Sequence, residues 1–509
     1  MKTLKNIMIL SCFAFVVLCS LSGCVGPGTA KATISFDTGF NDVSINPITL
    51  EVGEKITPPE EPKKEGFKFV TWLKDGEKYA FDTMPEQDIV LTADWLNLSY
   101  SAGSLPCMSI DLFDNNGKEF PLDLINREDY VDSKISITNT EEKYEVEELE
   151  AGFRGRGNGS WYGAGGKNGY KIKFKSKQGL FGREKNKHWV IIACKNFNDT
   201  TMYRNYMAYN MTGFALSNIE YTTNAEWIDV YINGDYHGVY LLCEHVRVGD
   251  GRVEIESEYG VEDTGYLIEY DAYATGEEGV DYFKVDGVRW PFTVKSPDPE
   301  EYEKDGGLTK EQYKLQVAYI KNYVQAVYNA ALSHDYATFS SLVEVNSFVD
   351  MYLIHELFKN RDTGWSSFFM YKKPGGKLFA GPVWDFDGTT NISVRGDASP
   401  YGIYVAKDVY EISKVSTNML FLELYKTEEF LTLVKTRWQQ IASSIDTFVD
   451  EKMNESVFEE HKKSMAKNFV MWNNKTQEEA ETDWVNDVVA LKQWFKDRID
   501  WLSNEWKLG

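Results

Sequence analysis

The sequence predicts an α+β fold with a β-rich first half, a helix-rich second half and a small β-rich module in front. Strand-like alternation of apolar and polar residues dominates up to about residue 295. The composition also changes at Leu98, which separates the module from the body. Helical periodicity follows in four segments: Lys310–Leu332, Asn346–Asn360, Leu420–Ile445 and Trp484–Trp506.

Composition and charge limit the possible classes of protein. The chain has 509 residues, 43% hydrophobic and 14% aromatic, so most of it has enough apolar side chains to form packed cores. The formal net charge is −24 at pH 7. An acidic surface repels phosphate backbones, so we expect no nucleic-acid partner.

The N-terminal segment predicts export and anchoring. Lys2 and Lys5 precede an apolar run, Ile7–Leu18, that is too short to span a bilayer comfortably. The run leads to Leu-Ser-Gly-Cys24, which resembles a bacterial lipobox. This resemblance implies that residues 1–23 are a lipoprotein signal peptide and that Cys24 is lipidated, which would tether the mature chain to the membrane outside the cytoplasm. An ordinary cleaved secretion signal is the alternative.

Residues 24–32 form a short Gly/Pro/Ala-containing linker, and residues 33–97 form the β-rich module. Expected strands in the module are Ile34–Phe40, Ile48–Ile56 with an interruption at Gly53, Gly66–Trp72 and Ile89–Trp95. The order F-D-T, V-G-E-K-I, E-G-F-x-F-V-x-W and L-T-A-D-W resembles one internalin-type B repeat, the Listeria–Bacteroides repeat. Such repeats are spacers or adhesive units of bacterial surface proteins, and no catalytic constellation is visible in this one.

The cysteines predict neither a zinc site nor a disulfide scaffold. Three of the six lie at or before Cys24, and the others are Cys107, Cys194 and Cys243. There is no C-x-x-C pair, so we expect buried free thiols.

Two neighbouring segments are suited to binding phosphate. Arg154–Trp161 is rich in glycine and arginine, although a surface hairpin would have the same composition. In the strand that follows, Lys171, Lys173 and Lys175 share one face, and one of them could reach a phosphate. A solvated strand face is the alternative reading.

A hairpin is expected at Asp229–Glu244, because Asn233-Gly234 is a strong two-residue turn signal. Glu244 ends its second strand and could pair with a lysine or mark the mouth of a cleft.

Two aspartates flank a second expected hairpin. Asp362 precedes the strand-like segment Phe368–Lys372, and Asp385 follows Leu378–Ala380. Folding of the hairpin brings both carboxylates to the same end. One carboxylate can accept a hydroxyl proton while the other holds Mg²⁺ on phosphates, and a carboxylate pair also suits glycoside hydrolysis.

From about Ser104 to Asp446 the chain resembles the spore coat protein H (CotH) kinase family, which has a two-lobed, atypical protein-kinase-like fold. The motifs that carry the resemblance are RGRGNGSW, GYKIKFK, FNDTTMYRN, VYINGDYHGVYLLCEHV, GYLIEYD, NRDTGW and PVWDFDG. The resemblance implies a kinase-like domain at residues 98–446 and a C-terminal helical extension, residues 447–509, packing on it.

The resemblance also implies site residues and cofactors. Asp362 matches the catalytic-loop aspartate, and Asp385 matches the metal-binding aspartate of the D-F-G element. Lys173 would contact the nucleotide phosphates, with Lys171 as the alternative, and Glu244 would be a lysine partner or hinge residue. The implied cofactors are ATP and Mg²⁺ or Mn²⁺.

One position departs from the kinase pattern. Kinase catalytic loops place a metal-binding Asn five residues after the aspartate, and this chain has Ser367 there, a weaker ligand. Two functions are therefore predicted. The first is a surface-anchored protein kinase that phosphorylates an exported or surface protein. The alternative is a catalytically inactive kinase-like scaffold or adhesion lipoprotein.

Overall fold

The computed structural model describes most of the chain from residue 30 to residue 507. The described residues are 30–99, 101, 103–157, 161, 166–193, 199–276, 281–298, 310–360, 362–392, 398–407 and 416–507. The expected lipidation site Cys24 and Cys194 lie outside these ranges, as does Ser160 of the glycine-rich segment. The chain divides into two compact units, one formed by Met1–Pro62 and Trp72–Asp94, the other by Lys63–Thr71 and Trp95–Gly509.

The N-terminal module is a β-sheet with the strand order β2-β1-β5-β3-β4, in which β1 and β5 are parallel. Its strands are β1 (Lys31–Asp37), β2 (Ile48–Glu51), β3 (Phe67–Lys74), β4 (Glu77–Lys78) and β5 (Ile89–Asn97). All of the expected strands are present, but the second ends at Glu51 and does not reach Ile56. Gly53 explains this early end, because its φ of 83° belongs to a turn and not to a strand.

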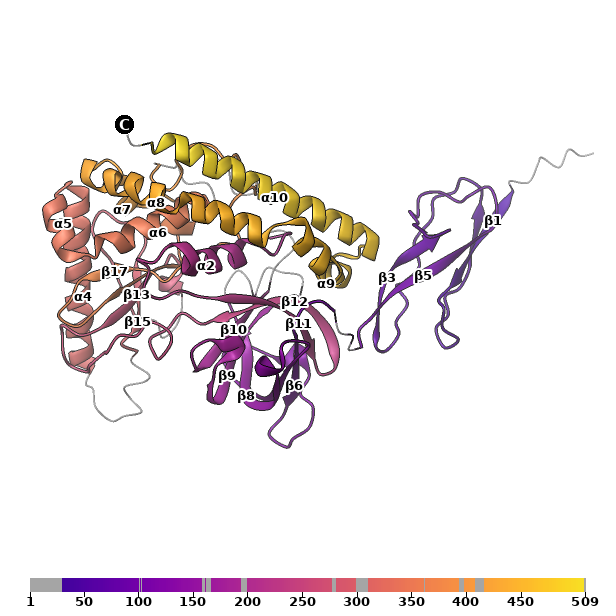
Figure 1. Ribbon diagram of the computed structural model, residues 1–509. Helices are drawn as coiled ribbons and strands as arrows, with labels where there is room; N and C mark the ends of the chain where they lie inside the picture. The colour runs from indigo at the N-terminus through magenta and orange to yellow at the C-terminus, as the bar shows by residue number, and fades with distance from the viewer. Residues whose placement is uncertain are drawn as a thin grey trace, which may run out of the picture. The chain divides into compact units, whose positions relative to one another are not determined.

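The first part of the body is a closed β-barrel with the strand order β10-β12-β11-β6-β7-β8-β9 (Figure 1). Its strands are β6 (Cys107–Phe113), β7 (Val131–Thr138), β8 (Val146–Arg156), β9 (Gly169–Gln178), β10 (Asn186–Ala193), β11 (Ala225–Ile232) and β12 (Asp235–Glu244). In β9 the side chains of Tyr170, Ile172 and Phe174 are buried in the barrel core, so the lysines between them point outward, as the alternation predicts. The Asn233-Gly234 turn joins β11 to β12 as expected, with positive φ at both residues.

A second sheet has the order β14-β15-β13-β16-β17 and combines segments from both halves of the chain. Its strands are β13 (Tyr266–Tyr270), β14 (Tyr282–Phe283), β15 (Phe292–Ser296), β16 (Phe368–Lys372) and β17 (Leu378–Ala380). The hairpin of β16 and β17 was expected from the sequence; β16 pairs with the central strand β13, and β17 is the edge strand of the sheet.

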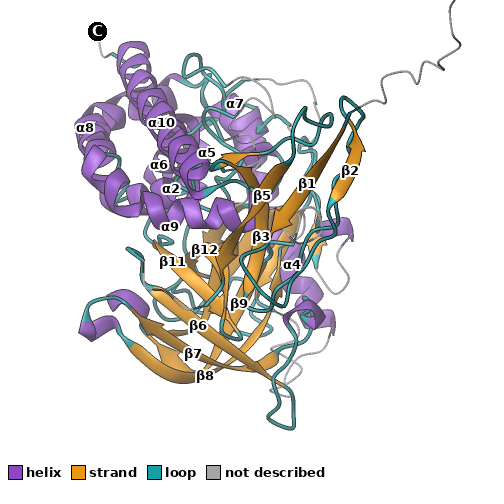
Figure 2. Ribbon diagram, turned by 90° about the vertical axis from the view of Figure 1, so that its right-hand side faces the viewer, coloured by secondary structure: helices purple, strands orange, loops and turns teal. Residues whose placement is uncertain are grey.

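Helices make up most of the remaining body. They lie together on one side of the barrel (Figures 1 and 2). They are α2 (Arg204–Ala215), α4 (Lys310–Leu332), α5 (Tyr336–Leu342), α6 (Val345–Leu357), α7 (Met419–Leu424), α8 (Glu428–Lys452), α9 (Glu455–Asn473) and α10 (Gln477–Glu505). The expected helical segment Leu420–Ile445 is divided into α7 and α8, because Asn418 and Thr427 begin two separate helices. The α+β prediction is confirmed.

Helix α6 is the central helix of this body, with nearly every side chain buried. Its two buried carboxylates are paired with arginines of the C-terminal helices: Asp350 with Arg437 at 2.8 Å and Glu356 with Arg498 at 2.6 Å. Buried charges are tolerated when they are paired and hydrogen-bonded. The chain that leaves α6 toward Asp362 therefore starts from a rigid support.

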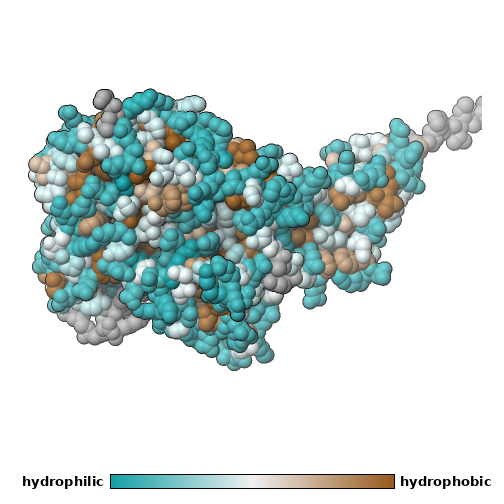
Figure 3. All heavy atoms as spheres, viewed as in Figure 1, coloured by the Kyte–Doolittle hydropathy of each residue, from teal (hydrophilic) through white to brown (hydrophobic). Residues whose placement is uncertain are grey.

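The remaining predictions concern thiols and surface. Cys107 and Cys243 are buried free thiols, as expected. On the face shown in Figure 3, hydrophobic residues are scattered among hydrophilic ones. Among the described helices, none combines the length and the apolar character that crossing a bilayer requires.

Candidate active site

Asp362 lies in a short turn, Asp362–Gly364, directly beyond α6, and is 8% exposed. The side chain of Asn360 joins this turn to the segment that carries Asp385. Its Oδ1 accepts a hydrogen bond from the backbone N–H of Asp362 at 2.9 Å, and its Nδ2 donates to the carbonyl of Asp385 at 3.2 Å. A single amide therefore connects the two aspartates through their backbones.

Asp385 lies on the loop that follows β17, which we call the acidic loop, residues 385–391. Its φ of 62° is left-handed, a conformation uncommon outside glycine and tolerated best by Asn and Asp. The loop is held by α2: the N–H of Asp385 donates to the Tyr209 hydroxyl at 3.1 Å, and the N–H of Phe386 donates to Asn205 Oδ1 at 2.7 Å. The ring of Phe386 is buried and stacks on His355 of α6, with centroids 4.8 Å apart.

Three carboxyl groups, those of Asp385, Asp387 and Asp362, lie close together at the acidic loop. Burial raises the pKa of Asp385 well above its ordinary value, and the nearby charges of Asp387 and Asp362 raise it further. A hydrogen bond with Asp387 acts in the same direction, while Arg156 lowers the pKa. Crowded carboxylates of this kind are stabilised by a cation that neutralises them.

The oxygen donors fit Mg²⁺ or Mn²⁺. Mg²⁺ binds through one or two carboxylates together with phosphate oxygens and water. Ser367 adds a hydroxyl, with its Oγ 3.5 Å from Asp385 Oδ2. Within the described part of the chain, no group of three or more His, Cys, Asp or Glu side chains is arranged to hold a metal ion.

A basic cluster lies on the outer face of the barrel around Lys171. Arg154 of β8 is directly opposite Lys171 in the strand pairing. Burial lowers the pKa of Lys171 to about 7, and the positive charges of Arg154, Arg156, Arg247 and Lys295 contribute. Such a concentration of positive charge favours an anionic ligand.

Lys173 lies differently from Lys171, although it points to the same face of β9. Its side chain is exposed, and its Nζ is 5.7 Å from the ring centroid of Tyr130. Of the two lysines considered from the sequence, the structure therefore brings Lys171 into the basic cluster and leaves Lys173 at its edge.

Arg156 connects the basic cluster with the acidic loop. Its guanidinium lies 5.5 Å from the ring centroid of Trp384, the residue before Asp385, and its charge acts on both Lys171 and Asp385. Cationic and anionic groups that lie far apart in the sequence thus meet at one place.

Two family models match parts of the chain. A family model described as CotH kinase protein matches residues 153–502, and one described as the Listeria-Bacteroides repeat domain matches residues 33–94. The chain belongs to the CotH kinase family. No curated protein matches the chain significantly.

The CotH kinase match runs from within β8 to within α10. It therefore contains every candidate residue of the body, and it includes the helices that follow residue 446. The N-terminal repeat, expected at residues 33–97, coincides with its family match to within three residues.

Glu244 has a different partner from the one expected. Its carboxylate pairs with Arg252 Nη1 at 3.0 Å and accepts a hydrogen bond from the backbone N–H of Asn224 at 2.8 Å. An arginine from the following loop, not a lysine, therefore balances this buried charge, which supports the end of β12.

The sequence analysis of this CotH kinase protein missed the role of α2. Asn205 and Tyr209 were not candidates, although they hold Asp385 and Phe386. The only available signal was the motif FNDTTMYRN, which contains the start of this helix. Its partners lie in the acidic loop, far away in the sequence, so no local pattern reveals the contact.

Proposed function

We propose that this protein is a phosphotransferase that moves the γ-phosphoryl group of ATP to a hydroxyl side chain of an exported or surface protein. The observation that carries the proposal is the meeting of the Lys171 cluster with the acidic loop at Arg156. Cations that bind phosphate beside carboxylates that bind metal are the two parts that phosphoryl transfer requires. Neutral sugars have no need of the basic cluster, so glycoside hydrolysis is the poorer reading of the carboxylate pair.

In this proposal the basic cluster binds the phosphates of ATP. Lys171 and Arg156 are the best placed, because one lies at the centre of the cluster and the other beside Asp385. Asp385 and Ser367 would hold Mg²⁺ or Mn²⁺, which neutralises charge on the β- and γ-phosphates when it is bound.

Asp362 would act on the acceptor. Its carboxylate takes the proton of the substrate hydroxyl as that oxygen bonds to the γ-phosphorus, and the bond from the γ-phosphorus to the β,γ-bridging oxygen breaks. ADP carries away the electron pair of that bond. The turn from Asp362 to Gly364 packs closely against the backbone of Ser416, since a Cβ on Gly364 would clash with the Ser416 carbonyl oxygen. Such fixed placement is the main protein contribution to phosphoryl transfer.

We further propose that the barrel and the remainder of the body act as two lobes that close around the nucleotide, as in protein kinases. The barrel contributes Lys171 and Arg156, whereas the segments around α6 and the β16–β17 hairpin contribute Asp362 and Asp385.

Location and partners complete the proposal. The lipobox-like segment ending at Cys24 supports anchoring of the mature chain to the membrane outside the cytoplasm, and the repeat supports a place at the bacterial surface. The substrate would then be a protein exposed in the same compartment.

The alternative function is a catalytically inactive scaffold or adhesion protein. Ser367 favours this alternative, because serine replaces the amide that completes the kinase metal site. Nucleotide binding separates the two candidates, since a passive scaffold gains no thermal stability from Mg-ATP.

The test uses the full chain with ATP and Mg²⁺ or Mn²⁺, alone and with a generic protein acceptor, and records intact mass. We expect a gain of phosphate with the wild type and none with Asp362→Asn or Asp385→Ala. Asp450→Asn, an exposed change on α8, is the matched control and should behave as the wild type. Equal phosphate transfer by all four proteins would overturn the assignment, and absence of any Mg-ATP binding would favour the scaffold.

A further inference from the structure

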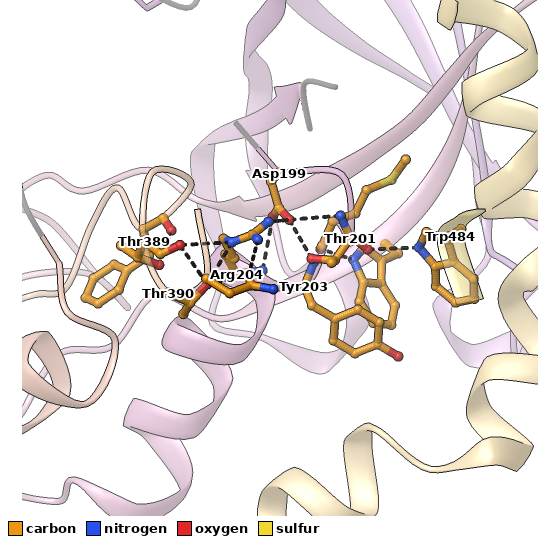
Figure 4. Close-up of polar contacts among 11 residues, drawn as sticks. Asp199, Thr201, Tyr203, Arg204, Thr389, Thr390 and Trp484 are labelled. Carbon is orange, nitrogen blue, oxygen red and sulfur yellow. Dashed lines mark hydrogen bonds and ion pairs between the residues drawn. The ribbon is translucent and has the colours of Figure 1, made fainter. Parts of the chain in front are cut away.

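Arg204, the first residue of α2, joins the start of that helix to the far end of the acidic loop (Figure 4). Its side chain is 3% exposed. The guanidinium Nε donates to Thr390 Oγ1 at 2.8 Å and to the Thr389 carbonyl at 3.1 Å, and Nη2 donates to Asn391 Oδ1 at 2.6 Å. One side chain therefore forms hydrogen bonds with three consecutive residues of the loop.

Asp199 orients this arginine. It is 2% exposed, and its Oδ1 accepts from Arg204 Nη1 at 2.6 Å. The same carboxylate accepts the backbone N–H of Arg204 at 3.0 Å and the hydroxyl of Thr201 at 2.6 Å. The ion pair is thus fixed by hydrogen bonds on the aspartate side as well as on the arginine side, which selects one geometry.

The turn that carries Asp199 is itself anchored from two directions. Trp484 of α10 donates its indole N–H to the Thr201 carbonyl at 3.0 Å (Figure 4), and Trp227 of β11 donates to the Met202 carbonyl at 3.0 Å. Arg204 consequently has a fixed position relative to both the barrel and the C-terminal helices.

The acidic loop needs such support. Asp385 and Thr390 both have left-handed backbones, with φ of 62° and 63°, and this is costly for a β-branched residue such as threonine. Conformations of this kind persist only where the surrounding structure holds them. Tyr209 and Asn205 hold the beginning of the loop, and Arg204 holds its end.

We propose that Arg204, oriented by Asp199, is a positioning residue that keeps the acidic loop in the conformation in which Asp385 binds the metal. The metal part of this inference rests on the proposed function. Groups that orient metal ligands from outside the coordination sphere typically change metal affinity by 10–100-fold when they are altered.

The test compares the full-length wild type with Arg204→Lys, which keeps the charge but lacks the forked donors. Hydrogen–deuterium exchange of the peptide containing residues 382–392 reports the loop without any assumption about function. Titration with Mn²⁺ in the presence of ADP, followed by electron paramagnetic resonance, reports metal binding. We expect faster exchange in this peptide and roughly tenfold weaker Mn²⁺ binding.

Arg437→Lys is the matched control, because Arg437 forms a similar ion pair with Asp350 at 2.8 Å. Its side chain also donates to Gln440, Ser217 and the carbonyl of Ala215 at the end of α2, and none of its partners belongs to the acidic loop. This control should lose a comparable amount of thermal stability without changing exchange in residues 382–392 or Mn²⁺ binding. Thr390→Val removes the hydroxyl that accepts from Arg204 and donates to the Thr389 carbonyl, and it serves if Arg204→Lys does not fold.

Unchanged exchange in Arg204→Lys would overturn the inference, and so would faster exchange with unchanged Mn²⁺ affinity. If the wild type itself binds no Mn²⁺ with ADP, the proposed function fails. Faster exchange in Arg204→Lys but not in Arg437→Lys would then still support the holding of the loop by Arg204.

Discussion

Arg498 Nη2 lies 2.6 Å from Glu356 Oε1, and neither side chain is exposed to solvent. Glu356 also accepts the backbone N–H groups of Tyr404 and Val405, both at 2.7 Å. The last helix of the chain is therefore joined to the helix that leads to Asp362. This ion pair makes α10 part of the packed body that carries Asp362.

Replacing Arg498 with methionine should strongly destabilise the protein. The Glu356 carboxylate would remain buried without its cation, and loss of one partner of a buried pair typically costs about 3–5 kcal/mol. Urea unfolding measures the free energy. As a control, Lys134→Met breaks an exposed pair with Glu148 and should change stability little. Similar stability of the two variants would contradict the structural role of the Arg498 pair.

Binding of ATP should depend on pH through Lys171. The pKa of its ammonium is lowered to about 7 in the folded protein, and an anion beside it would raise that pKa. We expect binding at pH 8 to take up nearly one proton, and the affinity to fall about tenfold from pH 7 to pH 8.5. Calorimetry in buffers of different ionisation enthalpy measures the uptake.

Lys171→Arg should remove this pH dependence, because an arginine stays protonated throughout the range. Lys173→Arg is the matched control on the same face of β9 and should leave the pH dependence intact. The reverse result would make Lys173 the phosphate-binding lysine. In the free protein, the contribution of Lys171 to the free energy of unfolding should increase as pH rises from about 7 toward 10.5, since the unfolded chain then holds more protons.

Asp385→Asn should stabilise the metal-free protein while abolishing its response to Mg-ATP. Burial and the nearby charges of Asp387 and Asp362 disfavour the ionised carboxyl of Asp385 in the fold, and a neutral amide avoids this cost without opposing the positive φ. We expect a gain of about 1 kcal/mol in thermal unfolding. The gain should vanish below pH 3.8, where the wild-type carboxyl is protonated in both states. A variant that still gains stability from Mg-ATP would contradict the metal-binding role.

Ser367→Asn should be tolerated and should strengthen metal binding. Ser367 has a φ of 64°, which asparagine adopts readily, and its Oγ already lies 3.5 Å from Asp385 Oδ2. Ser367→Val should lose about 1–2 kcal/mol, because a β-branched residue is strained at this φ. Mn²⁺ titration and urea unfolding test the pair of variants. Equal destabilisation by Asn and Val would show that packing, not backbone conformation, limits this position.

Local patterns in the sequence predicted those parts of the site that depend on neighbouring residues. One hairpin separates Asp362 from Asp385, so their proximity followed from its turn. The alternation in β9 gave the face that carries the lysines. It did not distinguish Lys171 from Lys173, because the difference comes from Arg247 and Lys295, which join the cluster only in the folded chain.

Contacts between distant segments explain what the sequence analysis did not provide. Glu244 pairs with Arg252 across an irregular loop, and Arg204 reaches the acidic loop from another part of the chain. Such contacts depend on tertiary packing, to which neither periodicity nor residue spacing is sensitive.

The position of α10 also has a consequence for protein synthesis. Trp484 anchors the turn before α2, and Arg498 anchors the helix before Asp362, so both halves of the site depend on α10, which is synthesised after them. A ribosome adds about 5–20 residues per second, so the nascent polypeptide spends on the order of ten seconds with Asp362 made but Arg498 still missing. The site would thus be complete only after α10 has been synthesised and has packed against these two segments.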